Sequence, residues 1–104
     1  MTPLTASGEP FEDDGLTAAM WGLPFQSCVQ VTNLNTFQRV TVRINDRGSH
    51  TRLVMQGRLI DLSRAAFAEV ADLRDGLIPV QLEPGDPIHC REPLRSVSSA
   101  LSPR

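Results

Sequence analysis

The segment Val40-Thr-Val-Arg-Ile-Asn-Asp-Arg-Gly48 carries the clearest strand pattern in the chain and ends in a turn rich in functional groups. Its three aliphatic β-branched residues, Val40, Val42 and Ile44, alternate with polar ones, so one face of the predicted strand is apolar and the other is polar. The alternation stops at Asn45, because Asn and Asp can bond their own backbone in a turn and Gly48 tolerates a positive φ. The pattern therefore predicts a strand that leads into a turn.

Asp46 lies where this predicted strand ends. A carboxylate fixed at a rigid strand end is well placed for acid/base chemistry, so Asp46 is the first candidate catalytic residue. A structural alternative stays open, in which Asp46 is only a turn residue paired with Arg43 or Arg47.

The composition bounds the function. A length of 104 residues indicates a single domain with a modest core. The net charge is −2, so the sequence lacks the basic character that is typical of proteins that bind nucleic acid. All ten cations are arginines. No stretch is long and apolar enough to span a bilayer, and no signal peptide is visible at the N-terminus. The sequence predicts no cofactor.

The two cysteines leave three arrangements open. Cys28 and Cys90 could form a disulfide in an oxidising compartment or remain buried thiols in a reducing one. In a small barrel the two positions could approach within disulfide distance. With His50 and His89 they could instead make a four-ligand zinc set, but His89 and Cys90 are adjacent and no Cys-x-x-Cys motif is present, so we predict no metal.

The first half of the chain reads as a loop, a short helix and a hairpin. Residues 1–14 are rich in loop-forming residues, and Glu9 is expected to stay free within them. Thr17 can cap a helix of one or two turns that ends at Gly22. Residues 28–34 alternate as a strand, and turn residues then lead into the Val40 strand, which predicts a hairpin.

The second half predicts a strand, a helix and a closing strand. Residues 57–62 read as a short buried strand in which Asp61 supports the following helix N-terminus. Ser63 is the expected N-cap of a helix over 64–73 that buries Phe67 and stops before Gly76. Residues 77–82 are expected to form the last strand, in which Pro79 must occupy an edge or an unpaired site. The expected domain limits are 1–14 for the loop, 15–83 for a barrel and 84–104 for a Pro/Ser-rich tail.

Several short strands around one helix favour a small all-β barrel over a parallel α/β sheet. The motifs Leu16-Thr-Ala-Ala, Leu23-Pro-Phe, Val29-x-Val-Thr-Asn-Leu, Val42-x-Ile-Asn-Asp-Arg-Gly and Gly57-Arg-Leu-Ile-Asp-Leu-Ser follow one another in order. Together they resemble the rare lipoprotein A domain of bacterial septal lytic transglycosylases, which is related to expansins. The resemblance implies a six-stranded double-psi β-barrel with one or two short helices.

The resemblance also implies an activity and a site. Family members cleave peptidoglycan glycan strands to 1,6-anhydro products, because the C6 hydroxyl of the sugar attacks in place of water. Glu9 and Asp46 match the family's catalytic carboxylates, and Asp61 matches a second acidic position of double-psi barrels. The family histidine after Thr-Ala-Ala is Met20 here, and a thioether cannot transfer protons. We therefore expect weakened activity.

Two further departures concern the barrel and its rim. The family's opening strand is apparently missing, so we expect another chain, a homo-oligomer or the segment 88–90 to pair with the exposed edge. The connection between Gly48 and Gly57 is longer than in the family, and it contains His50, which could replace the missing imidazole.

Three hypotheses follow for the function. The first is a peptidoglycan lytic transglycosylase domain of the cell envelope, in the periplasm or at the outer membrane. The second is a non-catalytic module that binds glycan or protein in the same groove, where an exposed Trp21 would stack on sugar rings. The third is an assembly domain with no glycan function. In addition to the carboxylates, the expected substrate contacts are Met20, Trp21, Asn45 and Arg47.

Overall fold

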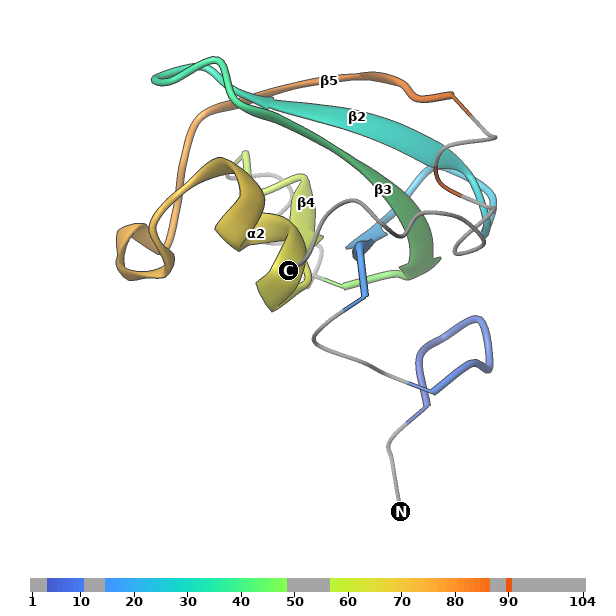
Figure 1. Cartoon of the computed structure of the whole chain (residues 1–104). Helices are drawn as coiled ribbons and strands as arrows, with labels where there is room; N and C mark the ends of the chain where they lie inside the picture. Colours follow the sequence, from blue (N-terminus) through green and yellow to red (C-terminus); the bar gives the residue numbers. More distant parts are fainter. Residues whose placement is uncertain (1–3, 11–14, 49–56, 87–89, 91–104) are drawn as a thin grey trace, which may run out of the picture.

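A computed structural model describes residues 4–10, 15–48, 57–86 and 90. Within them the chain forms a single sheet with strand order β4-β1-β3-β2-β5, one α-helix and one 3-10 helix. In Figure 1 the strands β2, β3 and β5 run along one another in a curved sheet, and α2 lies below them near β4. This is the curled, mostly β arrangement that a double-psi β-barrel domain requires, with five strands in the described residues where six were expected.

The predicted hairpin is confirmed. β2 (Cys28–Asn33) and β3 (Arg39–Asp46) pair antiparallel, with Val29 opposite Val42 and Val31 opposite Val40. The aliphatic residues of both strands lie on one face and are buried, as alternation with a period of two demands. They are Val29, Val31, Val40, Val42 and Ile44. This face is the centre of the core.

The short helix expected after Thr17 is wrong. Residues Thr17–Met20 form β1, which lies between β3 and β4 in the sheet. Four residues are too few to support an isolated helix, whereas in the sheet their backbone groups pair on both sides. The strands that pair with β1 are remote in sequence, and this pairing decides the backbone conformation in place of the local capping signal at Thr17.

A β-bulge separates the last two register positions between β1 and β3. Ala18 lies opposite Ile44, but Ala19 lies opposite Asp46, so Asn45 has no partner residue on β1. An extra residue of this kind re-aims the side chains that follow it. The bulge places Asp46 on the same face as Ala19, away from the core that contains Ala18 and Ile44.

The helix α2 (Arg64–Val70) begins at the predicted N-cap. Ser63 accepts the Ala66 N–H through its hydroxyl oxygen and donates to the Gly15 carbonyl at 2.6 Å. The helix buries Ala66 and Val70, whereas Phe67 is only half-buried, so the expectation that Phe67 is the buried anchor is wrong.

The C-terminal end of α2 comes earlier than predicted. Asn33, which is 2% exposed, donates its side-chain amide to the Val70 carbonyl at 2.7 Å and satisfies a helix-end acceptor. A separate 3-10 helix, η1 (Leu73–Asp75), follows with Asp72 as its cap. Gly76 has a φ of 71° and ends η1 rather than α2.

The two strands at the sheet edges are both short. β4 (Ile60–Leu62) pairs with β1, and β5 (Val80–Pro84) pairs with β2. β5 begins later than the predicted strand 77–82, so Pro79 lies just before β5 and not within it. The pairing expected of the segment 88–90 falls largely on residues 88 and 89, which lie outside the described residues.

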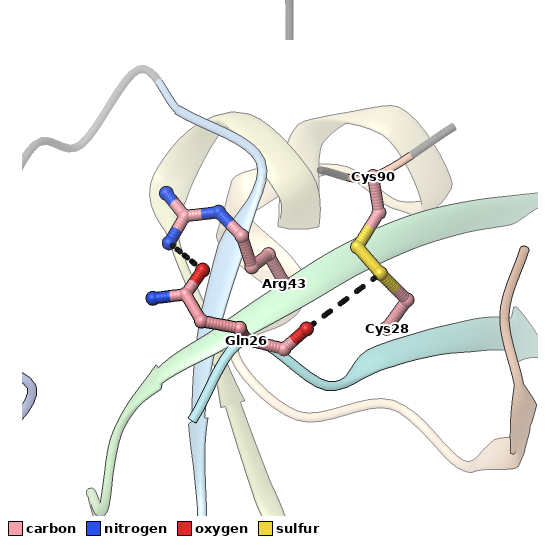
Figure 2. Close-up of a disulfide and its surroundings, with 4 residues drawn as sticks. All are labelled: Gln26, Cys28, Arg43 and Cys90. Carbon is pink, nitrogen blue, oxygen red and sulfur yellow. Dashed lines mark hydrogen bonds between the residues drawn. A yellow bond between two sulfur atoms is a disulfide. The ribbon is translucent and has the colours of Figure 1, made fainter. Parts of the chain in front are cut away.

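The cysteines form a disulfide. Cys28 and Cys90 are bonded across 62 residues of sequence, with their Cα atoms 5.9 Å apart. Figure 2 shows the bridge beside Gln26, whose carbonyl oxygen lies 4.0 Å from the Cys28 sulfur. The bond confirms the disulfide interpretation and excludes the thiol and zinc alternatives. His50 and His89 lie outside the described residues.

None of the helices in the described ranges is long and apolar enough to cross a membrane.

Candidate active site

Asp46 is fixed at the bulged end of β3 by two backbone groups. Its Oδ1 accepts the Arg47 N–H at 2.8 Å and the Ala6 N–H at 3.1 Å. Across residues 4–10, 15–48, 57–86 and 90, no hydrogen bond is made to its Oδ2. The carboxylate is therefore oriented through one oxygen, while the other faces away from these donors and can exchange a proton with a ligand.

Asp61 lies two strands away on the same face of the sheet. Ala19 is the register partner of both Asp46 on β3 and Asp61 on β4, so it separates the two acidic residues. Neighbouring strands are about 4.8 Å apart, which places the backbones of the two acids roughly 10 Å from each other.

Gly48 packs closely over this part of the sheet. A Cβ atom at Gly48 would lie 2.6 Å from the Ala19 Cβ and 2.9 Å from Asp61 Oδ2, and its φ is 69°. Only glycine fits such an approach and such a conformation. The turn after Asp46 therefore folds back onto Asp61, which brings the two acidic positions into one site.

Glu9 is not free, contrary to the expectation. Its carboxylate accepts two parallel hydrogen bonds from the Arg43 guanidinium, at 2.8 and 2.9 Å. Asn45 and Gln26 donate their side-chain amides to the same carboxylate at 3.0 and 3.3 Å. Hydrogen bonding from Arg43 is the largest cause that lowers the pKa of Glu9, to about 2, and it outweighs the opposing effect of burial.

The side chain of Arg47 does not pair with the Asp46 carboxylate. Its Nη1 donates to the carbonyl oxygens of Met20 at 3.1 Å and Leu23 at 2.7 Å. The guanidinium carbon also lies 4.0 Å from the centre of the Phe25 ring and 5.8 Å from that of Trp21. Arg47 thus holds the 20–25 segment against the end of β3 through carbonyl and cation–π contacts.

Met20 and Trp21 follow one another but face different surroundings. Met20 is half-buried and packs against the hydrophobic core, whereas Trp21 is 53% exposed. The exposed indole beside a cation is a surface that can stack on a sugar ring.

Comparisons with known proteins agree with this geometry. A family model described as "Lytic transglycolase" matches residues 2–82, which is well over half of the chain. The chain belongs to this family.

Curated relatives point to the same family. The chain is 42% identical over 79 residues to the endolytic peptidoglycan transglycosylase RlpA of Campylobacter jejuni, covering 76% of this chain and 27% of that protein. It is 46% identical over 79 residues to RlpA of Pasteurella multocida, covering 76% and 26%. It is 52% identical over 62 residues to RlpA of Yersinia pestis, covering 60% and 16%. The chain thus spans about a quarter or less of the length of these relatives.

Sequence reasoning found the acidic residues of this family member but missed the partners of Glu9. Gln26 and Arg43 both contact the Glu9 carboxylate, yet neither was expected to do so. The only available signal for Arg43 was its place on the polar face of β3, three residues before Asp46. For Gln26 the sequence offered no signal. The possible substitute His50 lies outside the described residues.

Proposed function

We propose that this domain is a peptidoglycan-processing domain of lytic transglycosylase type, which binds glycan strands and cleaves them to 1,6-anhydro products. The observation that carries the proposal is Asp46, a carboxylate fixed by two backbone N–H groups through one oxygen at the bulged end of β3. The family match over residues 2–82 and the printed names of the relatives support it.

The proposed mechanism needs two groups that exchange protons with the sugar. One accepts the proton of the C6 hydroxyl as this oxygen attacks the anomeric carbon, and the other protonates the departing glycosidic oxygen. Asp46 can serve as one of them through Oδ2. Met20 holds the position where the family places an imidazole, so the second group is missing there. We infer that turnover is slow, since the loss of one acid/base partner typically costs about a hundredfold to ten-thousandfold in rate.

The disulfide supports a location in the cell envelope. Disulfides persist in oxidising compartments, which include the bacterial periplasm, and are rare in the cytosol. Cys28 and Cys90 form such a bond. We therefore propose the periplasm or the periplasmic side of the outer membrane as the working location, where glycan strands are the accessible partner.

A second candidate function is a non-catalytic glycan-binding module. It is favoured by Met20, which cannot transfer protons, together with the exposed Trp21 beside Arg47. In this case the face of the sheet that carries Asp46 and Asp61 recognises glycan without cleaving it.

Incubation of the domain with sacculi stripped of stem peptides tests both candidates. Release of 1,6-anhydromuropeptides by the native chain but not by Asp46→Asn supports the enzyme. Sedimentation with sacculi without any such product supports the binding module. Failure both to sediment and to release product would reject both and favour an assembly domain.

A further inference from the structure

Every acceptor site of the Glu9 carboxylate is filled. Oε1 accepts from Arg43 Nη2 and Asn45 Nδ2, and Oε2 accepts from Arg43 Nη1 and Gln26 Nε2. An ionised carboxylate offers about four lone-pair sites, so four donors saturate it. No lone pair is left to accept a proton from a substrate, and no proton is present to give.

The donors of this cluster also bind one another. Gln26 accepts a hydrogen bond from Arg43 Nη1 at 3.0 Å through its amide oxygen, while its amide nitrogen binds Glu9. Figure 2 shows the Gln26 side chain pointing at the Arg43 guanidinium, next to the disulfide. The result is a closed network of Glu9, Gln26, Arg43 and Asn45, which we call the Glu9 clamp.

Gln26 takes part in the Glu9 clamp while its own backbone is in an unfavourable conformation. Its φ is 75°, a left-handed value that residues other than glycine rarely adopt. Such conformations are energetically unfavourable and persist where the surroundings determine them, most often at functional sites. Here the Gln26 N–H donates to the Ile44 carbonyl at 2.8 Å, which holds the residue against β3.

The Glu9 clamp connects directly to Asp46. Residues 4–10 form a tight turn in which the Thr5 N–H donates to the Glu9 carbonyl at 2.8 Å. The same turn donates the Ser7 N–H to the Asn45 carbonyl and the Ala6 N–H to Asp46 Oδ1. If the Glu9 clamp opens, the turn loses its side-chain anchor, and Asp46 loses one of the two donors that orient it.

We propose that Arg43 and Gln26 are positioning residues for Asp46, which act by holding Glu9 as the anchor of the 4–10 turn, and that Glu9 carries no proton in the reaction. This inference rests on the proposed function for its catalytic consequence, but the coupling of Arg43 to Asp46 can be measured without any activity. Arg43 and Glu9 are separated by 34 positions in the sequence, so the Glu9 clamp is a tertiary contact and not part of a local turn.

The structural arm of the test uses NMR on the oxidised full chain. In Arg43→Gln the Glu9 carboxyl should titrate closer to its ordinary range, the Ala6 amide should lose protection from exchange, and the chemical shift of the Arg47 amide, which donates to the same Asp46 oxygen, should change. Gln26→Gly opens the Glu9 clamp from a different position, because it removes the Gln26 side chain that binds Glu9 and Arg43. Glycine suits the positive φ of residue 26, so this second variant retains the fold. Arg74→Gln, which breaks only the exposed pair with Asp72, is the matched control and should change none of these signals.

The catalytic arm compares product release in the Met20→His background. Glu9→Gln and Arg43→Gln should each reduce kcat about ten- to hundredfold, as expected for a misplaced catalytic group. The double variant should lose no more than either single variant, because both open the same clamp. The pH profile of kcat should keep its shape in Glu9→Gln. If Glu9 carried a proton in the reaction, the pH profile of kcat in Glu9→Gln would lack one ionisation. The losses of the two single variants would then add in the double variant.

The outcomes separate the two proposals. If Arg43→Gln and Gln26→Gly leave the signals of the Ala6 and Arg47 amides unchanged, the positioning role is overturned whatever the activity. It is also overturned if these signals change and the Met20→His background releases product, but Arg43→Gln in that background releases as much product as Arg74→Gln. If no background releases product while the NMR signals change as expected, the enzymatic function is rejected and the coupling of Arg43 to Asp46 stands.

Discussion

Arg47 contacts Met20 only through the backbone, because its Nη1 donates to the Met20 carbonyl oxygen at 3.1 Å. The side chain at position 20 can therefore change without breaking the link between the 20–25 segment and the end of β3. This relationship makes position 20 a place where an imidazole can be introduced to test the proposed function.

Met20→His should raise the rate of anhydro-product release by about a hundredfold or more, because it returns an imidazole to the position that the family uses. The measurement is chromatographic quantification of 1,6-anhydromuropeptides from stripped sacculi. Met20→Gln, which is similar in size but cannot exchange protons, is the matched control. If Met20→His folds normally and releases no more product than the parent, the enzyme proposal gives way to the binding module.

Asp46→Asn should abolish the remaining release of product with little change in stability. The asparagine oxygen can still accept the Ala6 and Arg47 N–H groups, so the fold of the turn is retained while proton exchange is lost. Thermal unfolding and product release should be measured on the same preparation. Asp75→Asn, in the exposed η1, is the control. Equal release from Asp46→Asn and the parent would exclude Asp46 as the catalytic carboxylate.

Trp21→Ala should weaken sedimentation with sacculi by roughly three- to tenfold, the loss expected from one aromatic stacking contact. Phe37 is a suitable control, because it is 72% exposed and lies in the β2–β3 turn, away from β1. Phe37→Ala should leave binding unchanged. If the two variants lose the same amount, exposed aromatic surface in general accounts for the binding, and Trp21 is not a specific sugar contact.

Local sequence patterns predicted the parts of the fold whose contacts join residues near one another in the sequence. The β2–β3 hairpin follows from alternation and turn residues, and Ser63 was identified as the N-cap from its position before an apolar stripe. β1 was missed because its identity as a strand depends on β3 and β4, which lie far along the chain. Local propensity is a weak guide when remote pairing decides the backbone conformation.

The same reason limited the prediction of the site. The acidic residues Glu9, Asp46 and Asp61 were found because carboxylates in motifs are visible in a sequence. The Arg43–Glu9 pair joins residues 34 positions apart, and no spacing rule connects them. The bulge at Asn45, which turns Asp46 away from the core face, also depends on the register with β1 and cannot be read from β3 alone.

The disulfide should make a large contribution to stability. Reduction opens a link between residues separated by 62 positions, and the chain-entropy model gives about 4 kcal/mol for a loop of this size. We expect a lower unfolding midpoint in reductant, a change in electrophoretic mobility and no titratable thiol in the native protein. Two reactive thiols with unchanged mobility would contradict the bond, and the unfolding midpoint of the Cys28→Ser, Cys90→Ser double variant should not respond to reductant.

Glu9 should give the domain a distinctive acid sensitivity. Its pKa is lowered in the folded state, from the model-compound value of 4.5 to about 2, so the unfolded chain binds a proton before the folded one does. The stabilisation is therefore fully present above about pH 5 and is lost as the pH falls toward 2. Hydrogen bonds to a charged group contribute about 1.5 to 3 kcal/mol, which sets the scale of the loss. Urea unfolding of the parent and Glu9→Gln at several pH values should show that the free-energy difference between them shrinks over this window. A difference that stays constant from pH 5 to pH 2 would mean that the Arg43–Glu9 pair does not hold the carboxylate in its ionised form.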